Sequence, residues 1–369
     1  ALTGGAGSGA VGAADVTVAP GDDDVTVSAA FLNGFTGAAI TLTAAGDITF
    51  QESVNNAHAG TSPTAVAGGA LTVNAGKSIQ VAGDLRLTGD TISLRGNLTS
   101  TSGQVRLSGP ASLRDNDIVI SGASVVIDNA INSTQRALAI TATSGGITLN
   151  DDITLGSGAS HFTGPVTLGA DVQITAAGIT FGGNVTGTAH ALSLLGAGTK
   201  SLKAVNVASL TTGSSGSTTL AGDVTTSSDQ RYGNAVTAAA DVTLNAGSGA
   251  VSFASTLNGT TADTESVTVT AGTTTFGGAV GGGTRLDALT VTNAAHVDGG
   301  RVDARTQSYG ALEIGAATTL SGSSVTVTGA TAQAAPHALT IDADASLGTV
   351  TVDELTVNGS ATLQGDITT

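Results

Sequence analysis

The sequence repeats itself at long range, and this repetition restricts the folds open to the chain. The run YGNAVTAAADVTLNAG begins at Tyr232, and a related run, YGALEIGAATTLSG, begins at Tyr309, 77 positions later. A third related run begins at Phe162, 70 positions before Tyr232. Each run consists of short segments in which apolar and polar residues alternate, the pattern of a strand with one buried face. Imperfect repeats of this kind indicate a repeat architecture.

We place the long imperfect repeats near residues 162–231, 232–308 and 309–369. Alternating segments also precede them, so we expect one continuous segment of a single fold over residues 1–369. Residues 1–14, which are mostly Gly, Ala and Ser, lack the pattern and are expected to be loosely ordered. Because the last copy of a recurring motif, LQGDITT, stops at Thr369, we expect the chain to belong to a longer protein.

Composition favours a narrow core of small aliphatic side chains. Only 2% of the residues are aromatic, and Met, Trp and Cys are absent, so Ala, Val, Leu and Ile must fill the interior. The absence of cysteine excludes disulfides and thiolate chemistry. The 53 glycines and 5 prolines lack the three-residue period of collagen and stand between alternating segments, which argues against a flexible linker.

A short motif, Gly followed by Asp or Asn and then an apolar residue, recurs between strands. Its copies include Gly46-Asp47, Gly83-Asp84, Gly96-Asn97, Gly183-Asn184, Gly222-Asp223 and Gly365-Asp366. Glycine accepts positive φ, and Asp or Asn can bond to its own backbone around a bend. We therefore predict that each copy is a corner. The segment Asn55–Ala67, which is irregular and contains Pro63, is predicted to be a loop pushed out of a turn.

Short strands without regular hairpin turns favour a right-handed parallel β-helix, an all-β solenoid. Each turn pairs with its neighbours, so an apolar face too small to be buried alone is covered. The spacing predicts roughly 19 to 20 residues per turn and about 18 turns in an elongated rod, right-handed like other parallel crossovers. No helical periodicity is present, so almost no helix is expected. The alternative, an array of antiparallel immunoglobulin-like sandwiches, lacks the Trp or Tyr anchors of such cores.

Charge excludes several partners. With 12 basic and 28 acidic residues the net charge is −16, which repels nucleic acid and anionic membranes. No apolar stretch approaches the roughly 20 residues that span a bilayer, so we expect no membrane insertion.

Two acidic clusters contain the oxygen ligands that calcium prefers, namely Asp22-Asp23-Asp24 and Asn150-Asp151-Asp152. Neither the nonapeptide calcium repeat nor the EF-hand pattern is present, so solvated turns are favoured and calcium stays an alternative. The corner residues Asp47, Asp84, Asp223 and Asp366 are likewise interpreted as turn residues. We expect no other cofactor.

The five histidines, His58, His161, His190, His296 and His337, do not form a metal-binding motif. His190 and His337 precede similar strands, and Arg136 and Glu265 take the equivalent place in other repeats. A position that accepts His, Arg and Glu is expected to lie on an exposed rim.

No catalytic residues are predicted, and we expect that the protein is not an enzyme. Hydrolytic triads require a nucleophile with a placed base, and no spacing singles one out. Carbohydrate-cleaving β-helices gather carboxylates, basic residues and aromatic platforms in one groove. Here the three lysines, Lys77, Lys200 and Lys203, are spread along the chain, as are two tyrosines and seven phenylalanines. Thr-x-Thr pairs such as Thr41-Thr43, Thr273-Thr275, Thr290-Thr292 and Thr326-Thr328 are typical of ice-binding faces, but neighbouring repeats do not keep them in register.

Several of these runs resemble a known family. ALTVNAGKSIQVAGDLRLTG at residues 70–89, and TFGGAVGG followed by LDALTVTNAA at residues 275–295, are similar to the repeats of filamentous-haemagglutinin-like exoproteins of two-partner secretion, above all to large biofilm-matrix adhesins. The resemblance covers most of residues 70–369. It implies a right-handed parallel β-helix, export through an outer-membrane transporter, and a secreted protein attached to the surface of a Gram-negative bacterium. The NPNG-type motif of the family's secretion domain is absent, so an internal segment is implied.

We therefore expect a rod-like stalk segment of an adhesin that binds extracellular polysaccharide or a cell-surface receptor on neighbouring cells. Its contacts would lie on one long face or on loops such as Asn55–Ala67. One alternative is a structural filament or surface-layer subunit, because open β-helix ends expose unpaired backbone. A third is a β-helical polysaccharide lyase.

Overall fold

The structure, a computed structural model, describes residues 16–18, 24–27 and 29–369, with side chains from residue 24 onward. The chain divides into two compact units, Ala1–Asn184 and Val185–Thr369. Unit 1 and unit 2 are described separately below. The prediction for residues 1–14 lies outside the described residues, and the prediction of one continuous segment over residues 1–369 stays a prediction.

The described part of unit 1 contains one short helix and 21 strands. In chain order they are β1 (Val16–Val18), β2 (Val25–Val27), α1 (Ala29–Gly34), β3 (Ala39–Ala44), β4 (Ile48–Phe50), β5 (Val54–Asn56), β6 (Ser62–Ala67), β7 (Ala70–Val73), β8 (Ile79–Val81), β9 (Leu85–Thr88), β10 (Thr91–Leu94), β11 (Leu98–Ser100), β12 (Gln104–Ser108), β13 (Ala111–Leu113), β14 (Ile118–Ile127), β15 (Ile131–Asn132), β16 (Leu138–Leu149), β17 (Ile153–Thr154), β18 (Ser160–Thr163), β19 (Val166–Leu168), β20 (Val172–Thr175) and β21 (Ile179–Phe181).

Unit 2 consists of strands and their connections. In chain order they are β22 (Val185–Leu195), β23 (Thr199–Leu202), β24 (Val205–Thr212), β25 (Ser217–Leu220), β26 (Val224–Thr226), β27 (Gln230–Tyr232), β28 (Ala235–Ala238), β29 (Val242–Asn245), β30 (Ala250–Phe253), β31 (Leu257–Gly259), β32 (Ser266–Thr270), β33 (Thr273–Phe276), β34 (Leu286–Val297), β35 (Arg301–Ile314), β36 (Thr318–Val327), β37 (Thr331–Gln333), β38 (Ala338–Leu347), β39 (Val350–Thr351), β40 (Glu354–Val357), β41 (Ala361–Leu363) and β42 (Ile367–Thr368).

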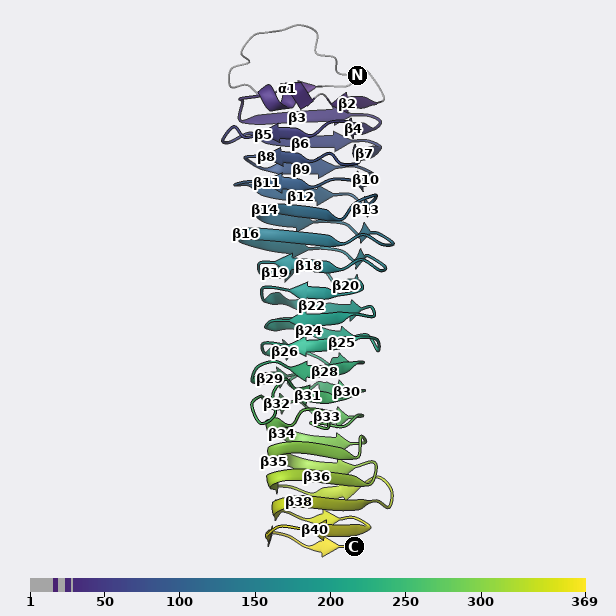
Figure 1. Cartoon of the computed structure of the whole chain (residues 1–369), viewed down its shortest axis with the longest axis vertical. Helices are drawn as coiled ribbons and strands as arrows, with labels where there is room; N and C mark the ends of the chain where they lie inside the picture. Colours follow the sequence, from purple (N-terminus) through teal and green to yellow (C-terminus); the bar gives the residue numbers. More distant parts are fainter. Residues whose placement is uncertain (1–15, 19–23, 28) are drawn as a thin grey trace. The chain divides into compact units, whose positions relative to one another are not determined.

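Unit 1 is a parallel β-solenoid with three strands in each turn. We name the faces by the order in which the chain visits them. Face 1 holds β7, β10, β13, β15 and β17; face 2 holds β8, β11, the start of β14, the start of β16 and β18; face 3 holds β9, β12 and the ends of β14 and β16. In Figure 1, β8, β9, β11, β12 and β14 follow one another down the picture. Parallel pairing through every turn excludes the antiparallel sandwich.

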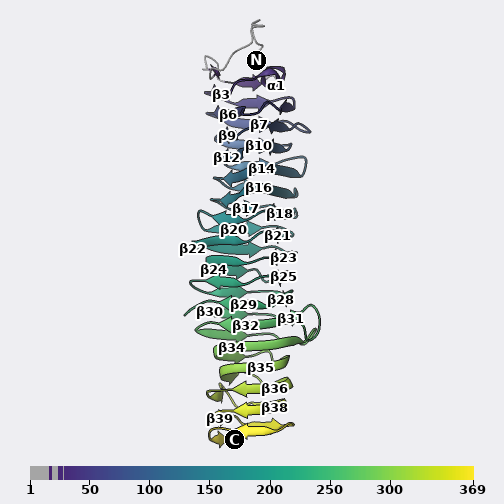
Figure 2. The ribbon, with the colours of Figure 1, turned by 90° about the vertical axis from the view of Figure 1, so that its left-hand side faces the viewer.

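Unit 2 coils in the same way. Face 1 holds β27, β30, β33 and the end of β34; face 2 holds β23, β25, β28 and β31; face 3 holds β26, β29, β32 and the start of β34. Longer strands such as β35, β36 and β38, which Figure 2 shows one below another, bend around corners and contribute to more than one face. The predicted parallel β-helix is therefore confirmed within each unit.

Turn length varies more than the sequence indicated. Ile79 pairs with Leu98, 19 positions later, as predicted. Val54, however, pairs with Ile79, 25 positions later, and Ile341 pairs with Val357, 16 positions later. The strands keep their register because the extra residues are confined to corners, which face solvent and tolerate insertions. The two units together contain about 17 turns, close to the expected number.

The interior of each unit holds columns of apolar side chains, one residue per turn. On face 2 of unit 1 the register joins Ile79, Leu98, Ile120, Ile140, Phe162 and Phe181. Each of these side chains is at most 1% exposed. Because residues of one column lie directly over one another, each turn covers the apolar face of the next. Burying one such side chain contributes about 1.5–3 kcal/mol.

Five of the nine aromatic residues stack on one another in these columns, although they are spread along the sequence. The rings of Tyr232 and Phe253 stack with centroids 5.0 Å apart, and those of Phe253 and Phe276 stack at 5.4 Å. In unit 1 the rings of Phe162 and Phe181 stack at 5.0 Å. Residues about twenty positions apart become neighbours because one turn separates them.

The long repeat does not return the chain to the same face. Tyr232 lies on face 1 of unit 2, in register with Phe253. Tyr309 pairs instead with Val291 and Val327, on face 3. The repeat of 77 residues is therefore three turns and two further strands, which is why its length drifts without disturbing the register.

The prediction of a loop over Asn55–Ala67 is wrong for most of the segment. Ser62–Ala67 forms β6, which pairs with β3 on one side, and only residues 57–61 connect it to β5. Pro63 is accommodated because pairing with β9 begins one residue later, at Thr64. A proline at the start of a strand removes little from the ladder.

In the motif copies at Asp47, Asp84, Asn97 and Asp223, the side chain bonds to the next turn rather than to its own bend. The Oδ1 atom of Asp47 accepts the N–H of Ala70 at 2.7 Å, and that of Asp84 accepts the N–H of Gln104 at 2.9 Å. Equivalent bonds join Asn97 to Val119, Asp117 to Ala137, Asp152 to Gln173, Asp223 to Thr243, Asp229 to Ala250, Asp241 to Ser266 and Asp344 to Ser360. The bond from Gln104 holds the pKa of Asp84 below its usual value, against the effect of burial. The motif therefore fastens consecutive turns.

We predict that Phe253→Ala lowers the free energy of unfolding by about 3–5 kcal/mol, because the ring between Tyr232 and Phe276 leaves a cavity. Urea unfolding followed by circular dichroism measures the change. The control is Ser252→Ala, on the outward side of the same strand, which is expected to change stability by no more than about 0.5 kcal/mol. Equal effects of the two variants would contradict the stacked column.

Candidate functional site

A polar groove of about 580 Å³ lies on unit 1, at the corner between faces 1 and 2. We call it the arginine groove, and its lining residues are Arg95, Ser112, Leu113, Arg114, Asp115, Asn132, Ser133, Thr134, Gln135, Arg136 and Thr154. An apolar cavity near α1 measures only about 10 Å³, which is too small for a ligand larger than a water molecule. A shallower depression of about 410 Å³ on unit 2 is lined by Asp342, Asp344 and Asn358 among others.

Consecutive turns build the arginine groove. Ile92 pairs with Ala111 and Ala111 with Ile131, so the corners that follow β10, β13 and β15 lie over one another. The ladder ends early at the third of these, because β15 contains only Ile131–Asn132. From Ser133 the chain forms its own turn.

The hydroxyl of Ser133 holds that turn together. Its Oγ atom accepts the N–H of Arg136 at 2.9 Å, while its own N–H donates to the carbonyl oxygen of Thr154 at 2.7 Å. The backbone is thus fastened to the following turn, and the side chains of residues 132–136 line the groove. The run NSTQR at residues 132–136 interrupts the alternation of apolar and polar residues. This interruption is the feature of the sequence that could have indicated the site.

A tight turn places Asp115 opposite Arg95. Asp115 has φ of 70°, and the N–H of Asn116 donates to the carbonyl oxygen of Arg114 at 2.8 Å, which closes a strained γ-turn. The Nδ2 of Asn116 donates to the carbonyl oxygen of Arg95 at 3.0 Å. The guanidinium of Arg95 then lies 3.3 Å from the Asp115 carboxylate. Next to Arg95, Gly96 is required, because a Cβ there would collide with the carbonyl oxygen of Lys77.

The other two arginines of the groove have no carboxylate partner among the described residues. The Nε of Arg114 donates to the Ser112 hydroxyl at 3.4 Å, and the side chain of Arg136 makes no hydrogen bond or ion pair within the described part of the chain. The nearby Asp117 carboxylate accepts the N–H of Ala137 at 2.9 Å. The lining thus contains planar guanidinium groups together with hydroxyl and amide groups, and this combination suits a hydroxyl-rich or anionic ligand.

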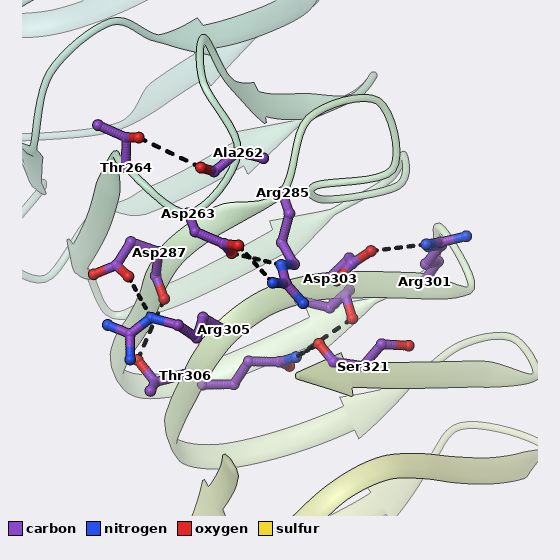
Figure 3. A network of polar contacts seen from close by, with 12 residues as sticks. Ala262, Asp263, Thr264, Arg285, Asp287, Arg301, Asp303, Arg305, Thr306 and Ser321 are labelled. Atoms are coloured by element: carbon purple, nitrogen blue, oxygen red, sulfur yellow. Dashed lines mark hydrogen bonds and ion pairs between the residues drawn. The ribbon is translucent and has the colours of Figure 1, made fainter. Parts of the chain in front are cut away.

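Unit 2 carries a contrasting cluster in which every arginine is paired. Arg285 forms a two-bond contact with Asp263 at 2.5 and 2.6 Å, and Arg305 bonds to Asp287 at 2.6 Å (Figure 3). Arg301 lies 2.8 Å from Asp303. The hydrogen bond from Arg285 lowers the pKa of Asp263. This cluster fastens the connection between β31 and β32 to the following turn, with its charges already neutralised.

The predicted acidic clusters serve the backbone where they are described. Asp22 and Asp23 lie outside the described residues, and the Oδ1 of Asp24 accepts the N–H of Asp47 at 2.9 Å. Asp151 accepts the N–H of Asp152 at 2.8 Å, and the amide of Asn150 donates to Asp128 at 3.0 Å. Nowhere in residues 24–27 and 29–369 do three or more Asp, Glu, His or Cys side chains form a group able to hold a metal ion.

The histidines are dispersed. His58 and His161 are exposed, and His190 and His337 are partly buried. His296 lies 3.1 Å from Glu313, its partner in the adjacent turn.

The expectation that Glu265 lies on an exposed rim is wrong. Its side chain is buried and accepts the N–H groups of Thr260 and Thr261 at 3.0 and 3.1 Å, together with the Thr260 hydroxyl. Burial opposes ionisation, but the bond from the Thr260 hydroxyl and these amides lower the pKa of Glu265 below its usual value. By accepting these hydrogen bonds, Glu265 closes the loop between β31 and β32.

A buried Gln-x-Tyr pair is present at the start of the repeats at Tyr232 and Tyr309. The Tyr232 hydroxyl donates to Oε1 of Gln230 at 3.1 Å, and Nε2 of Gln230 donates to the carbonyl oxygen of Asn245 at 3.0 Å. Gln307 repeats this with Tyr309 at 2.8 Å and with the carbonyl oxygen of Ser321, also at 2.8 Å. The sequence signal, QRYG and QSYG, was present, but its role in joining two turns was not foreseen.

Lys200 is also buried, at 1% exposure. Its Nζ donates to the carbonyl oxygens of Gly196, Gly198 and Ser215 at 2.5, 3.2 and 2.6 Å. Desolvation lowers its pKa. The ammonium group thus donates hydrogen bonds to carbonyl groups in two consecutive corners, the one before β23 and the one before β25.

The Thr-x-Thr pairs at Thr290-Thr292 and Thr326-Thr328 do not stack as pairs, because Ser308 and Gly310 lie in the turn between them. On face 3 of unit 2, Thr268, Thr290, Ser308 and Thr326 are in register. Thr273 and Thr275, by contrast, lie on face 1.

No protein-family model, no curated protein and no solved structure matches this chain. The resemblance to filamentous-haemagglutinin-like exoproteins thus rests on the repeats alone. Within the described residues, the structure has no helix of the length and apolar character needed to cross a membrane.

We predict that the stability of the protein falls above pH 10. Burial raises the pKa of both Tyr232 and Tyr309, the only tyrosines, above the usual value of 10.0. The folded state keeps protons that the unfolded state loses, so each tyrosine removes about 1.4 kcal/mol per pH unit above pH 10. Lys200, whose pKa is lowered, has the opposite sign just below its usual 10.5, and one such group offsets only one tyrosine.

The measurement is phenolate absorbance with circular dichroism during alkaline titration. Absorbance should rise only as the β signal is lost, and Tyr232→Phe/Tyr309→Phe should flatten the decline in stability. A phenolate midpoint near pH 10 in folded protein would contradict the prediction.

Proposed function

We propose that this chain is a stalk segment of a secreted bacterial surface or biofilm-matrix adhesin, and that it binds polysaccharide in the arginine groove. The observation that carries the proposal is the groove itself. Its volume of about 580 Å³ and its lining of arginine, amide and hydroxyl groups suit a chain of hydroxyl-bearing sugars. The donors come from consecutive turns, so an extended polymer meets several of them together.

The solenoid architecture supports the stalk role. Each turn in a unit is held by the next through parallel ladders, columns of buried side chains and the corner bonds described above. Such an architecture gives length and rigidity without a large globular core. The resemblance of residues 70–89 and 275–295 to two-partner-secretion exoproteins supports the setting: export through an outer-membrane transporter and attachment at the outer surface of a Gram-negative cell.

The binding test retains labelled full chain on a panel of immobilised neutral and acidic polysaccharides. Asn132→Ala/Gln135→Ala should weaken retention on the best polysaccharide by roughly tenfold, because two hydrogen-bonding amides are lost from the groove. The matched control is Asn55→Ala/Gln80→Ala, which removes one amide of each kind from exposed positions that pair with each other on face 2 of unit 1.

Failure of every polysaccharide to retain the chain, or equal loss in both double variants, would contradict the binding role. Concentration-dependent fibres in negative-stain images would favour the alternative of a filament or surface-layer subunit.

A further inference from the structure

The arginines of this protein divide sharply into paired and unpaired ones. Seven of the nine form an ion pair with an aspartate at 2.5–3.3 Å. The pairs are Arg86–Asp84, Arg95–Asp115, Arg106–Asp128, Arg231–Asp229, Arg285–Asp263, Arg301–Asp303 and Arg305–Asp287. The remaining two, Arg114 and Arg136, have no carboxylate partner within the described residues. Both line the arginine groove.

This coincidence stands out against the charge of the chain. The protein has a net charge of −16, and acidic residues outnumber basic ones by 28 to 12, so carboxylates are available to pair with every arginine. The groove lining nevertheless contains three arginines and one aspartate, and that aspartate is opposite Arg95. The groove therefore keeps two uncompensated positive charges on an acidic protein, and a concave surface concentrates their field.

The geometry suits a ligand with more than one acidic group. Arg114 and Arg136 follow β13 and β15, which pair directly, so the two guanidinium groups come from adjacent turns, whose backbones are about 4.8 Å apart. A guanidinium group presents a planar fork that matches carboxylate, sulfate or phosphate oxygens. The same lining contains Asn132, Ser133 and Gln135, whose amide and hydroxyl groups match sugar hydroxyls.

Nucleic acid fits the groove less well. Single strands are held largely by stacking of bases on aromatic side chains, and none of the lining residues is aromatic. The remaining acidic surface would repel a long phosphate backbone beyond the groove.

We propose that the arginine groove selects acidic glycans, with Arg114 and Arg136 binding carboxylate or sulfate groups on neighbouring sugars. This inference rests on the proposed polysaccharide-binding function and names the class of polysaccharide. The third arginine of the lining, Arg95, is already paired with Asp115.

The test measures binding of the full chain by calorimetry to oligogalacturonate, dextran sulfate, neutral dextran of matched length and a single-stranded oligonucleotide. Acidic glycans should bind at least about tenfold more tightly than dextran, and binding should weaken with salt as the charges are screened. The arm that binds more tightly, carboxylate or sulfate, identifies the acidic group. Equal or tighter binding of the oligonucleotide would overturn the assignment to glycans.

The decisive variant is Arg114→Gln/Arg136→Gln, which should weaken binding of the acidic glycan roughly 10- to 100-fold and leave dextran unaffected. The control Arg86→Gln removes the same charge from a paired arginine on face 3 and should change binding less than twofold or so. Unchanged thermal unfolding shows that the variants are folded; if the double variant unfolds, Arg114→Lys and Arg136→Lys, which keep charge but lose the fork, replace it.

Two negative results are distinguishable. If dextran binds as tightly as the acidic glycans and the arginine variants bind normally, the selectivity is wrong while polysaccharide binding stands. If no glycan binds at all, both the selectivity and the proposed function fail.

Discussion

Register between consecutive parallel turns is the constraint on which the structure depends. A strand of three or four residues cannot bury its apolar face alone, and only a matching strand directly above and below removes that face from water. Each inward position must therefore be apolar in turn after turn, as in the column from Ile79 to Phe181. A slip by one residue would turn every inward side chain outward, so the buried face strongly specifies the register.

The corners between the strands are free of this constraint. Since the strands hold the register, the connections between them can lengthen, shorten or fold back. The side chains that bond one turn to the next lie in these connections, and so does the candidate site. Asp84 reaches from one corner to the amide of Gln104 in the next turn, and Lys200 gathers three corner carbonyl groups. The arginine groove uses the same freedom, because the ladder stops at Asn132 and leaves the following residues to form a turn of their own.

Much of the fold was predictable from local pattern. Alternation of apolar and polar residues identified the strands, and the scarcity of aromatic residues indicated a narrow interior. The misjudged residues are those whose role depends on a partner one turn away. Pro63 was predicted to lie in a loop, but a strand can contain it because pairing with β9 begins at the next residue, Thr64. Glu265 was predicted to lie on an exposed rim, but the preceding loop folds over its side chain and donates hydrogen bonds to it. The candidate site was missed for a similar reason: Arg114 and Arg136 are 22 positions apart, and nothing local shows that both lack an aspartate.

The sequence by itself determined the kind of architecture, because a period of two residues with regular breaks admits few ways of burying its apolar side. Only the tertiary structure decided which residues meet across turns. Turn length varies from one corner to the next, so spacing along the chain does not reveal that Tyr232 and Tyr309 lie on different faces of unit 2. The position of a charge relative to the next turn, which pairs Arg285 with Asp263 and leaves Arg136 without a carboxylate partner among the described residues, is likewise set by the stacking alone.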